Sequence, residues 1–276
     1  EWCWIPFAVD LCYGLFTNKL MAYLERLNIG EKTSEYFIVL TQPKKRSLIQ
    51  EEERDILLIA KEILKNPQQQ KLFKELYASF EEQIASKKKL APHSPEYEAM
   101  LRKKVREIEH KIDPKVYQLL YKHYQDYFYV KFMFVGKEGV YSFQHFLKKV
   151  VKLIGRNAKI DTLLKEMDDQ VEENKKKAEE VKNKLGIEGT WEKLFDGFGE
   201  FMITKIYRRY AQIFALYKMH FVLEEIAKRL DLTKAEVQFM KPIEVEEALL
   251  QKKLDKNAIK KRTEFCVCYA EKGKDE

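Results

Sequence analysis

The sequence predicts a mostly α-helical fold, with about ten helices and at most one short strand near the C-terminus. Glycine and proline are scarce, with 10 and 7 among 276 residues, which favours long helices over a turn-rich sandwich. Helix-capping signals and helical spacing recur along the chain, whereas a period of two occurs once, from Phe265 to Tyr269. With 45% hydrophobic residues, the chain can bury a substantial core.

The first expected element is the apolar stretch at residues 2–16. It contains Pro6, Asp10 and Gly14, and it is shorter than the roughly 20 apolar residues that span a bilayer. We expect a core helix or a surface that packs on a neighbour. A truncated anchor or signal segment is the open alternative, since the sequence begins without methionine.

Capping signals mark the next helices. Ser47 and Gln50 form a capping-box pattern, and the helix that they open should end before Asn66 and Pro67. Two further starts have proline at the first helical position, at residues 94–95 and 113–114. Aromatic residues then recur at spacings of three and four, which predicts a core-facing stripe: Tyr117, Tyr121, Tyr124, Phe128 and Phe132.

Residues 160–185 follow a heptad pattern that predicts a long helical arm of about 39 Å. The arm should pair with a neighbouring helix, with Asn174 fixing the register, and end at Gly186, with Thr190 capping the next helix. Its seam comprises Ile160, Leu164, Met167, Val171, Asn174, Ala178, Val181 and Leu185. The expected organisation is therefore an N-terminal helical part (1–156), the arm (157–190), a C-terminal helical part (191–262) and a strand-like exit (263–276).

Composition and motifs exclude several functions. The net charge of +7 arises from mixed charges, and the basic clusters at residues 44–46, 87–89, 175–177 and 260–262 lack interleaved aromatic residues. We therefore expect no specific nucleic-acid partner and no membrane partner. No phosphate-binding loop or HExxH motif occurs, and the five histidines stand far apart, so we expect no catalytic residue, metal or cofactor in this chain. Acidic runs such as residues 51–53 are interpreted as solvated helix starts.

Cysteine usage favours a reducing, cytoplasmic setting. Cys3, Cys12, Cys266 and Cys268 form no CxxC pair, and we expect four free thiols.

Four segments resemble the helical middle region of phosphoenolpyruvate synthase and pyruvate phosphate dikinase-like proteins, just before their swivelling phosphohistidine domain. Residues 36–60 are similar to a stretch in which a proline and a serine precede an acidic helix start. His123 lies in a similar aromatic segment, where the family often has tryptophan at the place of Phe128 or Tyr129. The arginine-bearing helix at residues 207–210 and the turn at residues 239–244 complete the resemblance, although Lys241 stands where the family has threonine.

The resemblance implies a noncatalytic helical scaffold in an ATP-dependent phosphotransferase. In that family, a phosphohistidine carries phosphate to pyruvate or a related acceptor, and ATP and magnesium belong to the parent protein. The motifs for those steps, including the glycine-rich Thr-Ser-His segment, do not occur in this chain. The implied partners are the swivelling domain and a nucleotide-binding domain. The alternative is a free-standing interaction module that binds a partner helix through the 160–185 arm.

Three residues are candidates for contact with phosphate or with a neighbouring domain: Arg208 and Arg209 first, and His123 second. Arginine binds phosphate through planar, bidentate contacts, and Tyr207 and Tyr210 could hold a guanidinium against aromatic rings. The competing interpretation is structural. One arginine would then pair with an acidic side chain, the other would be solvated, and His123 would be a helix histidine near the surface.

Overall fold

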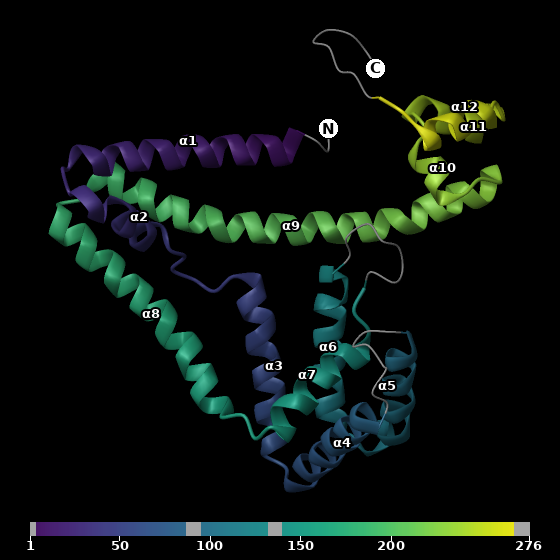
Figure 1. Ribbon diagram of the computed structural model, residues 1–276, viewed down its shortest axis with the longest axis horizontal. Helices are drawn as coiled ribbons and strands as arrows, with labels where there is room; N and C mark the ends of the chain where they lie inside the picture. Colours follow the sequence, from purple (N-terminus) through teal and green to yellow (C-terminus); the bar gives the residue numbers. More distant parts are fainter. Residues whose placement is uncertain (1–3, 87–94, 132–139, 268–276) are drawn as a thin grey trace. The chain divides into compact units, whose positions relative to one another are not determined.

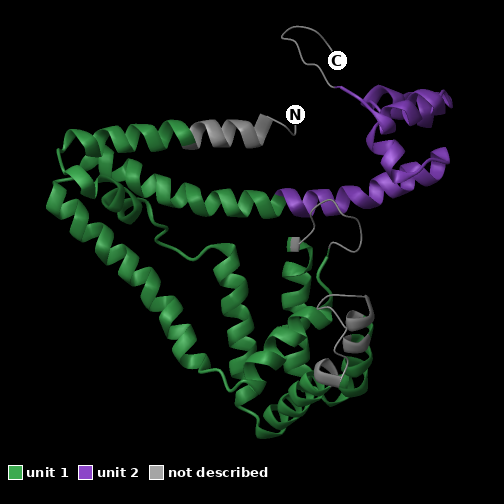
Figure 2. Ribbon diagram, viewed as in Figure 1, with its two compact units in different colours: residues 1–131, 140–211 green, residues 132–139, 212–276 purple. Residues whose placement is uncertain are grey.

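The described residues of this computed structural model, 4–86, 95–131 and 140–267, form twelve α-helices and contain no strand, which confirms the predicted all-α class (Figure 1). They divide into two compact units. The first holds the described residues of 1–131 and 140–211, and the second those of 212–276 (Figure 2). None of the described helices is long and apolar enough to cross a membrane.

The first unit contains the helices from α1 to α8 and the N-terminal half of α9. Short 3-10 helices follow α5 and α6 and precede α2. The bounds are α1 Trp4–Arg26, η1 Gly30–Lys32, α2 Thr33–Thr41, α3 Leu48–Leu64, α4 Pro67–Ser86, α5 Pro95–Ile108, η2 Glu109–Lys111, α6 Pro114–Tyr127, η3 Phe128–Lys131, α7 Phe143–Gly155, α8 Ile160–Leu185 and α9 Gly189–Leu230.

Helix starts follow the predicted chemistry. At the start of α3, the Gln50 amide donates to the Ser47 hydroxyl at 3.4 Å and the Ser47 amide donates to Gln50 Oε1 at 2.8 Å, so the capping box is confirmed. Asp113 caps α6 with proline following it. The predicted cap at Thr190 is wrong, because α9 begins one residue earlier, at Gly189.

The larger hydrophobic core joins α3, α4, α6, α7 and the start of α8. Phe73, Leu120 and Phe146 are fully buried in it. The approach of α4 to α7 depends on Gly155, because a Cβ atom there would collide with the ring of Tyr77. This core therefore rests on close helix packing as well as on burial of large apolar side chains.

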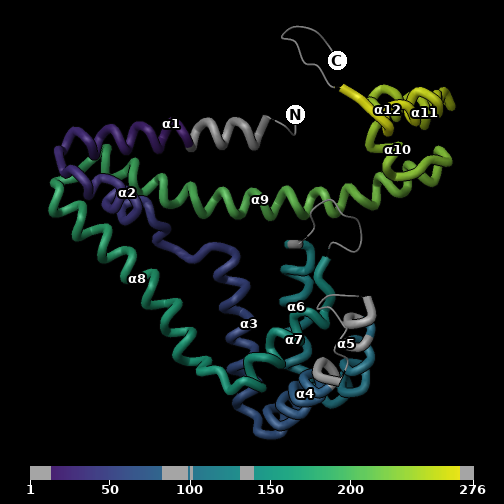
Figure 3. The backbone as a smooth tube through the Cα atoms, in the orientation of Figure 1, coloured from purple at the N-terminus to yellow at the C-terminus, as the bar shows by residue number. Residues whose placement is uncertain are grey.

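A second, smaller core joins the end of α1, α2, the end of α8 and the start of α9. Leu24, Leu40 and Phe195 are fully buried there, and the rings of Tyr23 and Trp191 stack at 4.0 Å. The 26-residue helix α8 contributes to both cores, and Figure 3 shows its path between them. Every seam position of the predicted arm is buried or half-buried, and α8 packs on α2 and α3 within the unit.

The predicted aromatic stripe of α6 is not the buried face of that helix. The buried positions are Val116, Leu120, His123 and Tyr127, whereas Tyr121 is 44% exposed. Tyr117 and Tyr124 pack only at the edge of the core, and Phe132 lies outside the described residues. The buried face lies one position from the predicted stripe, about 100° of rotation, and carries two aliphatic residues, a histidine and one tyrosine.

The second unit contains the C-terminal half of α9 and three short helices: α10 Lys234–Gln238, α11 Pro242–Gln251 and α12 Lys256–Glu264. Thr233 and Glu236 form a capping box at α10. Residues 265–267 belong to no strand, although the backbone of Phe265 is extended. The rest of the expected strand, from Cys268 onward, lies outside the described residues. Cys266 is a free thiol, and Cys3 and the Cys12 side chain are not described.

Candidate functional site

His123 lies in a buried polar cluster where α3, α6 and α7 meet. Its Nε2 atom is 3.3 Å from Glu52 Oε1, and the Lys149 ammonium donates to the same oxygen at 2.7 Å. Only 2% of the His123 side chain and 12% of the Glu52 side chain are exposed. His123 is therefore an interior residue, and the expectation of a histidine near the surface is wrong.

The electrostatics favour an ionised Glu52. Burial alone would raise its pKa, but hydrogen bonds from His123 and Lys149 outweigh burial and hold the pKa below the ordinary value. A carboxylate only accepts hydrogen bonds, so His123 Nε2 carries the hydrogen in this contact. The opposite ring atom, Nδ1, is buried and has no hydrogen-bond partner among the described residues.

Two tyrosines extend the cluster. Burial raises the pKa of Tyr127, as does the charge of Asp55, whose Oδ2 accepts from the hydroxyl at 3.3 Å. Burial also raises the pKa of Tyr210 on α9, and the negative charge of Glu52 adds to this shift. Both hydroxyls therefore remain protonated hydrogen-bond donors across the neutral pH range.

The two candidate arginines differ in their surroundings. Arg209 is exposed, whereas Arg208 is half-buried, with Nε and Nη1 shielded from solvent and without a hydrogen-bond partner among the described residues. Neither forms an ion pair within that part of the chain, so the pairing expected for one of them is not observed. Arg209 lies near enough to Tyr210 for its charge to oppose the rise in the tyrosine pKa.

The structure brings His123 together with Glu52 and Lys149, whereas no hydrogen bond joins His123 to Arg208 or Arg209 among the described residues. His123 and Lys149 donate hydrogen bonds to the Glu52 carboxylate and so balance its negative charge in the interior. Among the described residues, no group of three or more histidine, cysteine, aspartate or glutamate side chains could hold a metal ion.

Sequence reasoning missed Glu52 and Lys149. The acidic run at residues 51–53 suggests a solvated helix start, but Glu52 is in helical phase with Ile56, Ile59 and Ile63, which are buried. That phase was the available signal, because residues four and three apart share one face of a helix.

A second missed cluster surrounds Lys182 at the end of the α8 arm. Its ammonium donates to Glu179, Asp196 and Glu192 at 2.8, 3.0 and 3.1 Å, and Lys44 also pairs with Asp196. Burial would lower the pKa of Lys182, but these carboxylates more than compensate and raise it. The cluster ties the smaller core to the segment that precedes α3.

Carboxylates also pair with the basic clusters at residues 44–46 and 175–177. Lys45 pairs with Glu200, and Arg46 pairs with Glu51 and Asp168. Each lysine of the 175–177 cluster has a glutamate partner on its own helix. Much of the positive charge in these clusters is therefore balanced locally instead of forming a continuous basic surface.

The turn at residues 239–244 is anchored within the second unit. Arg262 of α12 donates to both carboxylate oxygens of Glu244, at 2.6 and 2.8 Å, and to the Phe239 carbonyl at 2.8 Å. Glu244 also accepts from the Lys241 amide at 2.8 Å, so Glu244 caps α11 although lysine replaces threonine. Just beyond α12, Phe265 and Val267 are 79% and 75% exposed.

Comparison of the chain with protein-family models, curated proteins and solved structures finds no match.

Proposed function

We propose that this chain is a noncatalytic helical scaffold of a phosphoenolpyruvate synthase-like phosphotransfer protein, in which it holds and orients a domain that carries phosphate. The observation that carries the proposal is the anchored C-terminal turn. Arg262 fixes α12 to the 239–244 turn, and the chain continues from that helix with two exposed apolar side chains, Phe265 and Val267.

Such a turn has the properties of a mechanical support. A bidentate arginine–carboxylate pair restricts orientation more than a single hydrogen bond does, so movement of α12 relative to α11 is limited. Exposed apolar side chains next to a fixed helix offer a place where a further element can pack. The family resemblance supplies the identity of that element, the swivelling phosphohistidine domain.

The alternative, an interaction module that uses the 160–185 arm, has less support. The α8 seam packs on α2 and α3 of the same unit, and Ile160, Leu164 and Ala178 are buried there. A partner helix would have to displace these contacts before it could bind the seam.

The coding sequence that surrounds the chain tests the proposal directly. A glycine-rich Thr-Ser-His segment downstream in the same reading frame would support a phosphotransfer scaffold. A stop codon close after Glu276 would contradict it.

In a protein that contains both parts, phosphorylation of the swivelling-domain histidine from ATP can be followed for Arg208→Gln and Arg209→Gln. We expect at least one substitution to slow the reaction by about tenfold or more, since an arginine–phosphate contact is a charge-assisted hydrogen bond. Unchanged rates with intact stability would leave both arginines outside the phosphate path. Lys205→Gln, on the same helix, is the matched control for loss of a positive charge.

A further inference from the structure

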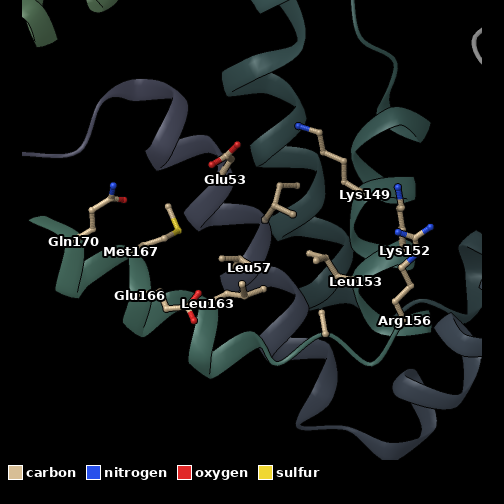
Figure 4. A pocket seen from close by; sticks show the side chains of 12 residues that line it. Glu53, Leu57, Lys149, Lys152, Leu153, Arg156, Leu163, Glu166, Met167 and Gln170 are labelled. Atoms are coloured by element: carbon tan, nitrogen blue, oxygen red, sulfur yellow. The ribbon is translucent and has the colours of Figure 1, made fainter.

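A cleft of about 630 Å³ lies between α3, α7 and α8 of the first unit (Figure 4). Its floor is apolar and includes Leu57, Leu153, Leu163 and Met167, which come from all three helices. The volume lies within the range of roughly 300–1,000 Å³ that is typical of small-molecule sites. The cleft is separate from the anchored turn of the second unit and does not depend on the function proposed above.

One edge of the cleft is basic. Lys152 and Arg156 stand one turn apart near the end of α7 and lie together in Figure 4. Neither has a carboxylate partner among the described residues, and the Arg156 Nε atom donates only to the Tyr77 hydroxyl, at 3.4 Å. Two cations so close repel each other, and an anion between them would reduce that repulsion. The negative end of the α7 dipole favours cations near this helix end. It does not occupy their N–H groups, which can still donate hydrogen bonds to an anion.

The other edge carries acidic side chains. Glu53 of α3 and Glu166 of α8 line the cleft and form no ion pair within the described part of the chain. Lys149 also lines it, but its ammonium is already held by Glu52. A ligand with a second anionic group would meet these carboxylates, whereas a single anionic head could bind at the basic edge.

We propose that this cleft binds a single-chain amphiphile with one carboxylate head, of the medium-chain fatty acid class. The carboxylate binds Lys152 and Arg156, and the hydrocarbon chain covers the apolar floor between α3 and α8. Head and chain are both required, because the cations give orientation and the floor gives contact area.

Laurate is the probe, titrated into the full chain below its aggregation concentration and followed by calorimetry. We expect saturable binding at one site. The double variant Lys152→Gln with Arg156→Gln should bind about tenfold more weakly or worse, because two charge-assisted contacts are lost. Lys165→Gln removes an exposed lysine of α8 that does not line the cleft, and it should bind laurate like the original chain.

Two further ligands separate this site from nonspecific adsorption. Dodecanol keeps the chain but lacks the charge, and dodecanedioate adds a second carboxylate that would approach Glu53 and Glu166. Both should bind at least about tenfold more weakly than laurate. Absence of saturable laurate binding, equal affinity in the double variant, or equal affinity for dodecanedioate would each overturn the proposal. Circular dichroism of the variants checks that a loss of binding is not a loss of fold.

Discussion

Glu52 illustrates how one side chain can organise three helices. Its carboxylate lies on α3, accepts from His123 of α6 and from Lys149 of α7, and is largely removed from solvent. An ionised carboxylate in such a place is stable only because both partners are present. The contribution of Glu52 to stability therefore depends on its charge and on pH.

We expect Glu52→Gln to lower the free energy of unfolding by about 1–3 kcal/mol at pH 7, because it weakens two charge-assisted hydrogen bonds. The folded pKa of Glu52 is below its ordinary value of 4.5, so its stabilisation is complete above pH 4.5 and is lost as pH falls through the lowered pKa. Urea unfolding at several pH values measures this, and the two proteins should converge in acid. Glu53→Gln, at an exposed neighbour, is the control; an equal loss there would contradict the assignment to Glu52.

Lys182 makes a second prediction at the residue scale. Its side chain is 3% exposed, and it contacts three carboxylates that are 39–54% exposed. Lys182→Met should cost about 1–3 kcal/mol, less than a fully buried pair would, because water can still reach the carboxylates. Lys177→Met removes an exposed lysine with one glutamate partner and should cost about 0–1 kcal/mol. Similar losses in thermal unfolding would show that burial of Lys182 adds nothing.

Local chemistry at the helix ends could be predicted from the sequence, and contacts between distant helices could not. The capping boxes at Ser47 and Thr233 involve residues three positions apart, so their patterns are complete in the sequence. The phase of α6 depends on which face meets α3 and α7, and aromatic spacing alone selected the wrong one. Glu52 and Lys149 are 97 positions apart, and no local pattern joins them.

At the element scale, Leu164→Asp tests the packing of the α8 arm. Leu164 is 8% exposed and belongs to the larger core, so an aspartate there would be a buried charge without a partner. We expect a loss of several kcal/mol, about 3–5, with a clearly lower melting temperature. Gln170→Asp places the same side chain on an exposed part of α8 and should change stability little. An unchanged melting temperature for Leu164→Asp would mean that the seam is open to solvent.

Gly155→Ala tests the contact between α4 and α7. The added methyl group would collide with the ring and the Cβ atom of Tyr77, so the two helices would have to move apart at this point. Although alanine favours a helix by about 1 kcal/mol over glycine, we expect a net loss of about 1–3 kcal/mol from overpacking. Chemical denaturation measures the net effect. Tyr77→Ala removes the ring but keeps the Tyr77 Cβ, which would lie 2.5 Å from the added methyl group, so the double variant should recover part of the loss. A double variant no more stable than the sum of the two single losses predicts would contradict the collision.

At the scale of the whole molecule, the two units differ in how much apolar surface they bury. The first contains both hydrophobic cores, whereas the second has few buried apolar side chains: Ile213, Ala227, Val237, Ala248 and Ile259. Composition predicted the helical class but not this unequal division, because mixed charge and helical spacing continue through both units. The α9 helix is continuous and contributes residues to both units.

Unequal burial predicts unequal local stability. Amide hydrogens of α11 and α12 should exchange with solvent faster than those of α3 and α7, because opening a short helix exposes less apolar surface. Arg262→Gln should accelerate exchange in α12 further, since it removes the bidentate pair with Glu244, and leave α3 and α7 unchanged. Lys261→Gln, at an exposed neighbour, is the matched control. Equal protection of all four helices would show that the units open together, and the C-terminal turn would then derive its rigidity from the whole chain instead of from Arg262.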